Sequence, residues 1–155
     1  MPSRRRLRYR ALQILFSWDA RRHSEEHRVS IDDAFTAYYE SLYSEESKVA
    51  IERDPFVERL VHAAVEAVES IDRRISVHAE HWRIERMPAV DRNILRLAVA
   101  EMLGERTPAP IVIDEALELA RRFSSEDSVH FINGVLDAVR RDLDAEAGSD
   151  KIAKP

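Results

Sequence analysis

The sequence predicts an all-α protein, a helical bundle of about six to seven helices in two packed subdomains. Apolar residues recur every three to four positions along most of the chain, which is the spacing of one helix face. Only three residues are glycine and six are proline, too few for the turns of an all-β fold. No segment shows a credible strand pattern, so we expect helices joined by loops.

Capping residues and the apolar repeat delimit six helices. The predicted helices span residues 3–22, 30–44, 55–77, 90–103, 114–123 and 127–143. Pro55 fits the first position of its helix, and Asp114 is expected to be an N-cap. A short helical piece is expected at 78–83, and residues 45–54 and 107–110 are predicted connectors.

The predicted helices fall into two halves that divide near Val77. Residues 1–77 are expected to form an N-terminal subdomain with an arginine-rich arm, and residues 78–144 a C-terminal subdomain. Each half has too few helices to bury a comfortable core, so the two are expected to share one. Residues 145–155 are predicted to be a disordered tail.

The net charge of -5 conceals a strong asymmetry along the chain. Five arginines lie in the first ten residues, and the rest of the chain carries 19 basic against 29 acidic side chains. A basic arm on an acidic body predicts a local anion-binding site. A solvated, frayed terminus would explain the charge equally well.

The composition argues against several classes of protein. There is no cysteine, and no apolar run approaches the roughly 20 residues of a membrane span. The N-terminus lacks the apolar segment of a secretory signal. We therefore expect a cytoplasmic, bacterial protein.

No constellation of residues predicts catalysis. The chain has no glycine-rich phosphate loop, no nucleophile elbow and no thiol. His23 with His27, and His78 with His81, have the spacing of metal ligands on a helix. Solvated surface histidines explain both pairs more simply. We therefore predict a protein that is not an enzyme and has no catalytic residues, cofactor or metal.

The first predicted helix has an unusual polar face. Its apolar stripe centres near Ala11 and Trp18, with Arg4 and Arg8 at the edge of the stripe. The opposite face holds Arg5, Arg6, Tyr9, Gln13 and Phe16.

Arginines beside aromatic rings suit single-stranded RNA, because guanidinium groups neutralise phosphates and rings stack on unpaired bases. We expect Arg4, Arg5, Arg6 and Arg8 to contact phosphates, with Tyr9 and Gln13 nearer the bases. The alternative is that the aromatic residues pack as ordinary core. That alternative is favoured for Phe16, whereas a surface role is favoured for Tyr9.

The last predicted helix has a second off-stripe aromatic residue. Its apolar stripe centres near Ile132 and Val139, and Phe131 falls about 90° away by the helical period. Phe131 shares that flank with Asp127 and Gly134. A binding surface and packing against another helix are equally consistent with this pattern.

These segments together resemble the NusB family. The resemblance covers residues 4–143, and its four motifs occur in the family's order and spacing. The motifs are Arg4-Arg5-Arg6-Leu7-Arg8 with Ala11 to Trp18; Val90 to Ala98 with Glu101; Ile113 to Ala116 with Leu119, Ala120 and Phe123; and Asn133 to Asp137. Trp82 also lies where the family often has tryptophan.

The resemblance implies a bundle of about seven helices that binds single-stranded boxA-type RNA. It implies pairing with the ribosomal protein NusE, and action with other Nus factors on RNA polymerase in ribosomal RNA operons. It also places Asp127 and Phe131 close to the RNA path. A homodimer of the free protein is left open.

The sequence departs from the family pattern at several positions. Leu7 stands where alanine is usual, and Tyr9 where an acidic residue is common. Ala100, Asp114 and Ser124-Ser125 also differ from the usual residues. Two alternatives to the antitermination factor are an RNA-binding helical domain related to ribosomal RNA methyltransferases, and an adaptor that binds only proteins. The chain lacks the cysteine and the cofactor domain that such a methyltransferase would need.

Overall fold

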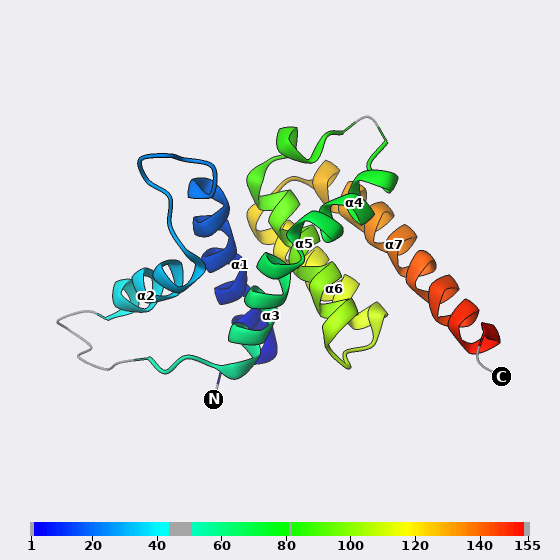
Figure 1. Cartoon of the computed structure of the whole chain (residues 1–155), viewed down its shortest axis with the longest axis horizontal. Helices are drawn as coiled ribbons and strands as arrows, with labels where there is room; N and C mark the ends of the chain where they lie inside the picture. The colour runs from blue at the N-terminus through cyan, green and yellow to red at the C-terminus, as the bar shows by residue number, and fades with distance from the viewer. Residues whose placement is uncertain (1, 44–50, 81, 154–155) are drawn as a thin grey trace.

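The structure, a computed structural model, describes residues 2–43, 51–80 and 82–153 (Figure 1). All regular secondary structure in these ranges is helical, which confirms the all-α prediction. The elements are α1 (Arg4–Arg21), α2 (Ile31–Leu42), α3 (Pro55–Glu66), α4 (Val68–His78), the 3-10 helix η1 (Ile84–Arg86), α5 (Ala89–Gly104), α6 (Ala109–Phe123) and α7 (Glu126–Ala153).

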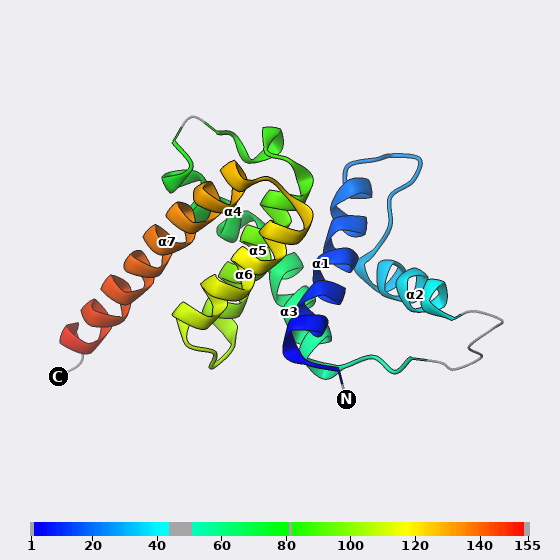
Figure 2. The same ribbon diagram turned by 180° about the vertical axis from the view of Figure 1, so that it is seen from behind.

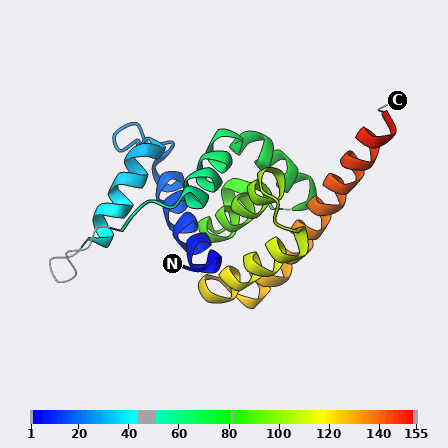
Figure 3. The same ribbon diagram turned by 90° about the horizontal axis from the view of Figure 1, so that it is seen from below.

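Helix α5 is the centre of the bundle. It packs against α1, α3, α4, α6 and α7, and it is buried without interruption from Asn93 to Glu101. One cluster of buried apolar side chains runs through helices on both sides of Val77, as expected for two halves that share a core. Helix α2 packs on α1 at one end of the molecule, and the C-terminal part of α7 extends at the other (Figures 2 and 3).

The helix expected over residues 55–77 is two helices. It breaks at Ala67, whose φ of -106° and ψ of 18° are not helical. Val68 and Ile71, just beyond the break, are still buried. The apolar repeat therefore continues through a change of direction, because α3 and α4 both pack on α5.

The connections also differ from the sequence prediction. Helix α4 ends at His78 and η1 begins at Ile84, and the described residues between them (79, 80, 82 and 83) do not form the helical piece expected at 78–83. His81, one of the histidines considered above, lies outside the described residues, as does much of the loop expected at 45–54. Helix α6 begins at Ala109 with Pro110 in its first turn, where the missing N–H is not needed. Asp114 is consequently inside the helix and is not its N-cap.

Helix α7 is longer than the sequence predicts. We expected disorder from residue 145, whereas the helix continues to Ala153. Arg74 of α4 donates two hydrogen bonds to Glu146, at 2.9 and 3.2 Å, and His78 pairs with Asp142. These contacts attach the extension to α4, and the sequence pattern gave no sign of them.

A buried ionic cluster fixes α1 on α5 and α4. Asp19 of α1 accepts hydrogen bonds from Arg92 at 2.6 Å and from Asn93 at 3.0 Å, and it pairs with Arg96 at 3.0 Å. Arg96 also donates two hydrogen bonds of 2.8 Å to Asp72 of α4. Burial by itself would raise the pKa of Asp19, but these donors outweigh burial and hold that pKa below its ordinary value.

This lowered pKa predicts how stability depends on pH. A depressed carboxyl pKa contributes stability above the unfolded value, about 3.9, and that contribution is lost as the pH falls through the folded pKa. The variant Asp19→Asn should lose roughly 3 kcal/mol at neutral pH, because half-buried Arg92 loses its charge partner and buried Arg96 keeps only Asp72. It should then lose less than the wild type on acidification. Urea denaturation across pH 7 to 2 measures both, and equal acid sensitivity of the two proteins would contradict this account of Asp19.

Candidate nucleic-acid interface

The arginine-rich arm is the first turns of α1. Ser3 caps the helix by accepting a hydrogen bond from the backbone N–H of Arg6 at 3.3 Å. Because the arm is helical, its arginines point in different directions. Arg4, Arg5 and Arg6 are exposed, whereas Arg8 is buried.

Arg8 is not placed where it could contact a phosphate, contrary to the expectation from the sequence. Its side chain donates two hydrogen bonds to Glu101 of α5, at 2.8 and 2.7 Å, and only 8% of the residue is exposed. The hydrogen bonds from Arg8 raise its pKa in spite of burial. A guanidinium held in this way joins α1 to α5 and is not presented to a ligand.

The three exposed arginines have different surroundings. Arg5 donates two hydrogen bonds to Glu115 of α6, at 3.0 and 3.1 Å, and both this contact and the charge of Glu115 raise its pKa. Arg4 lies over the ring of Phe56, with its guanidinium carbon 4.0 Å from the ring centroid. Within the described residues, Arg4 and Arg6 have no acidic partner at ion-pair distance. These two are therefore the most available cations of the arm.

Tyr9 and Gln13 are half-buried on one flank of α1, and Tyr9 also packs against the core. The Tyr9 ring stacks on Phe123, the last residue of α6, with ring centroids 5.0 Å apart and planes 10° apart. Gln13 donates a hydrogen bond to the Tyr9 hydroxyl at 2.9 Å and accepts one from Tyr38 of α2 at 2.8 Å. Phe16 is 40% exposed, so the expectation that it is core was wrong.

Phe123 was not among the predicted site residues. Its ring is 41% exposed and forms half of the aromatic pair with Tyr9. The sequence offered only a weak indication of this role: Phe123 is an aromatic residue at a helix end, directly after Arg121 and Arg122. Its partnership with Tyr9 depends on the packing of α6 beside α1.

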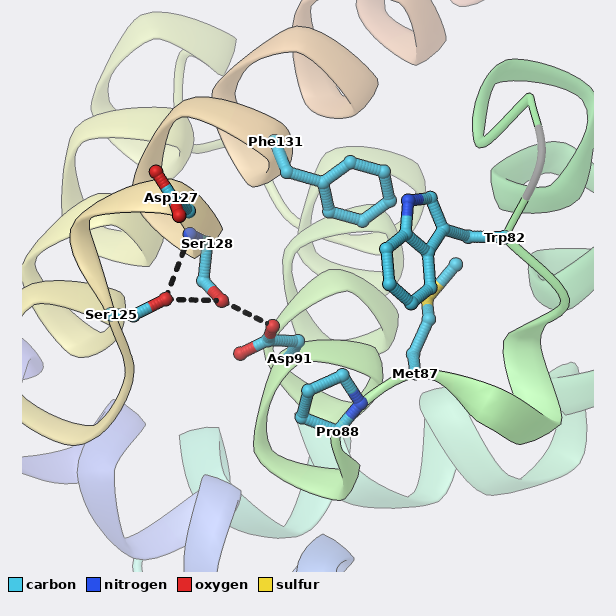
Figure 4. Close-up of a pocket in the computed structure, with 8 residues that line it drawn as sticks. All are labelled: Trp82, Met87, Pro88, Asp91, Ser125, Asp127, Ser128 and Phe131. Carbon is cyan, nitrogen blue, oxygen red and sulfur yellow. Dashed lines mark hydrogen bonds between the residues drawn. The ribbon is translucent and has the colours of Figure 1, made fainter.

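A hollow of about 350 Å³ lies near the start of α7 (Figure 4). It is lined by Trp82, Met87, Pro88, Asp91, Ser125, Asp127, Ser128 and Phe131. The Trp82 ring, 55% exposed, lies beside the Phe131 ring at a centroid distance of 6.4 Å. Phe131 is partly buried against the core and also lines the hollow, so its packing is confirmed and its part in binding stays a prediction.

The floor and the rim of the hollow carry acidic groups. Ser124 and Ser128 each donate a hydrogen bond of 2.6 Å to the buried carboxylate of Asp91. Asp127 at the rim is exposed. This hollow therefore offers apolar ring surface and hydrogen-bond acceptors, and it does not attract phosphate.

The arm and the hollow are joined through the turn between α6 and α7. Phe123 contacts Tyr9, and Ser125, two residues further on, lines the hollow. In the described part of the chain, no group of three or more His, Cys, Asp or Glu residues is placed to hold a metal ion. None of the described helices is long and apolar enough to cross a membrane.

Fold and surface together define a helical protein that presents cations next to stacked aromatic rings, a combination typical of nucleic-acid-binding proteins. The model of the NusB family matches residues 5–141, nearly the whole chain. The chain therefore belongs to the NusB family, whose members are transcription antitermination proteins and not enzymes.

Similar proteins support this assignment. A transcription antitermination protein NusB of Solibacter usitatus (strain Ellin6076) is 63% identical over 143 residues, 92% of each chain. The NusB protein of Koribacter versatilis (strain Ellin345) is 51% identical over 93% of this chain and 92% of its own.

Solved structures of NusB proteins share the fold. T. maritima NusB superposes with a TM-score of 0.74 at 32% identity, over 90% of this chain and 92% of its own. A NusB chain in a crystal structure of the antitermination factors NusB and NusE in complex with dsRNA has a TM-score of 0.72 at 29% identity. That match covers 89% of this chain and 96% of the other.

The burial of Arg8 predicts that its main effect is on stability. Arg8→Ala should cost roughly 3–5 kcal/mol, because it leaves the carboxylate of Glu101 buried without a partner. Arg6→Ala on the same helix should cost less than about 0.5 kcal/mol, since Arg6 is exposed. Urea denaturation of both variants compares them directly. Equal stability of the two variants would show that the Arg8–Glu101 pair does not hold α1 in place.

Proposed function

We propose that the protein binds a single-stranded boxA-type RNA along α1 and the α6–α7 turn, and that this binding supports antitermination. The observation that carries the proposal is that exposed Arg4 and Arg6 lie on the same helix as half-buried Tyr9, which stacks on exposed Phe123. The rest of the chain is acidic, so this arm is where a polyanion is attracted most strongly.

The residues suggest how the RNA lies on this surface. Arg4 and Arg6 would hold phosphates, with Arg5 contributing when it exchanges Glu115 for a phosphate. Arginine suits this role because its planar fork grips phosphate with two hydrogen bonds. Arg8 would act indirectly, by holding the helix that carries the others.

Bases would be placed by the aromatic groups. Stacking on an exposed ring adds about 1–3 kcal/mol per base. Tyr9 with Phe123 offers one such surface, and Trp82 with Phe131 offers a second. Asp127 cannot favour a phosphate, but its carboxylate can accept hydrogen bonds from base amino groups. These contacts need unpaired bases, which favours a single strand over a duplex.

The family relationship suggests the partners. A NusB relative has been crystallised with NusE and dsRNA. We propose that this chain likewise pairs with a NusE-type ribosomal protein. The pair would act with other Nus factors on RNA polymerase in the bacterial cytoplasm, during transcription of ribosomal RNA operons.

The salt dependence of RNA affinity tests the proposed surface. For single strands, the slope of log affinity against log salt is about -0.7 per phosphate neutralised. Arg4→Ala/Arg6→Ala should therefore flatten the slope by about 1.4 if each residue holds one phosphate. Fluorescence titrations at several salt concentrations measure this for the strand and for its duplex, with circular dichroism to confirm folding.

A matched control removes two exposed arginines elsewhere, Arg28 and Arg73, which lie outside α1, α6 and α7. This control variant should keep the wild-type slope. A slope unchanged by Arg4→Ala/Arg6→Ala in a folded protein would remove the arm from the RNA site. Repeating the titration with the NusE-type protein extends the test, because RNA and protein partner must tighten one another by the same factor.

A further inference from the structure

Three polar side chains beside the arm form a hydrogen-bonded chain from α2 to α1. The Tyr38 hydroxyl donates to Oε1 of Gln13 at 2.8 Å, and Nε2 of Gln13 donates to the Tyr9 hydroxyl at 2.9 Å. A carbonyl oxygen can only accept, so the Tyr38 hydroxyl is the donor in the first of these bonds, and burial raises its pKa. The chain therefore has one direction, from α2 toward Tyr9.

With the hydrogen bonds in this direction, the hydroxyl proton of Tyr9 is not donated within the chain of three side chains. A phenol has one proton to donate and lone pairs to accept, and the Tyr9 oxygen already accepts from Gln13. In the part of the chain that the structure describes, no protein acceptor faces that proton. The ring is held in turn by its stack on Phe123. Tyr9 is thus a donor fixed in position on a half-buried flank of α1.

We propose that Tyr38, although it belongs to α2 and not to the arginine arm, is a positioning residue that makes Tyr9 a hydrogen-bond donor to an acceptor atom of the bound RNA. This inference rests on the RNA-binding function proposed above. The acceptor is an oxygen or a ring nitrogen, supplied by a base edge or by the RNA backbone. A base amino group at this place would leave the Tyr9 proton without an acceptor, so it would bind less well.

The physical role of Tyr38 is to set the orientation of the Gln13 amide. An amide can present either its NH2 group or its carbonyl oxygen to a neighbouring hydroxyl. With Tyr38 donating to the carbonyl, the NH2 group faces Tyr9. Without Tyr38, the amide can turn so that its carbonyl accepts the Tyr9 proton. The donor would then be lost to the RNA although Tyr9 itself is unchanged.

Three variants test this arrangement: Tyr9→Phe, Tyr38→Phe and the double variant. Each single change should weaken binding of a single-stranded boxA-type RNA by roughly 2- to 10-fold, the effect of one hydrogen bond. The double variant should be no weaker than either single variant, because both remove the same donor. If Tyr38 had a merely structural role, the fold-losses of RNA affinity in the two single variants would instead multiply in the double variant.

Tyr39→Phe is the matched control. Tyr39 is the next residue of α2, its ring centroid lies 5.4 Å from that of Tyr38, and its hydroxyl takes no part in the hydrogen bonds of Tyr38, Gln13 and Tyr9. This change should leave RNA affinity at the wild-type level. Thermal melting of all variants checks that each is folded.

RNAs with one nucleotide replaced at a time identify the acceptor. If it is a base, wild type should discriminate at one position, and Tyr9→Phe and Tyr38→Phe should both lose that discrimination and no other. If it is a backbone atom, both variants should weaken all the RNAs equally.

The inference is overturned if Tyr38→Phe binds like Tyr39→Phe, or if the losses multiply in the double variant. Either result, with Arg4→Ala/Arg6→Ala still flattening the salt slope, would leave the proposed function intact. Absence of RNA binding by the wild-type chain would refute both.

Discussion

The rotation of α1 about its own axis is the constraint on which the proposed interface depends. Two buried ionic contacts set it, Arg8 with Glu101 near the start of the helix and Asp19 with Arg92 and Arg96 near its end. All the partners lie on α5. Buried charges are stable only when they are paired with good geometry. Rotating α1 about its axis in either direction would separate these charges from their partners. With the rotation fixed, Arg4 and Arg6 are exposed, and Tyr9 and Gln13 lie half-buried beside them.

The same residue type serves two purposes within one turn of helix. Arg8 is desolvated and locked by two hydrogen bonds, whereas Arg4 and Arg6 remain solvated and free of acidic partners in the described chain. Removing a buried partner costs several kcal/mol, whereas an exposed charge contributes little to stability. Stability and ligand binding are therefore divided between neighbouring arginines, and substitutions can address them separately.

The sequence predicted most of the fold because periodicity and capping are local signals. Helices α1, α2, α5 and α7 begin within a residue or two of their expected starts. The break at Ala67 was not predicted, because the helices on both sides of it bury one continuous apolar stripe on α5. The start of α6 at Ala109 was not predicted, because prolines such as Pro108 and Pro110 are typical both of connectors and of first helical turns.

The candidate site was predictable where it lies on one helix and not where it depends on packing. Helical phase placed Tyr9 and Gln13 off the apolar stripe, and both are half-buried in the structure. It could not show that Arg8, at the edge of the stripe, reaches Glu101, 93 positions away. The stack of Tyr9 on Phe123 and the link from Gln13 to Tyr38 likewise join residues distant in sequence.

An NMR titration of isotope-labelled protein with single-stranded boxA-type RNA would test the central claim most directly. The account predicts that the largest shifts occur along the first turns of α1, at Phe123 and at the start of α7 around Asp127 and Phe131. Shifts concentrated on the far end of α7 or on α3, with the arginine arm unaffected, would contradict it.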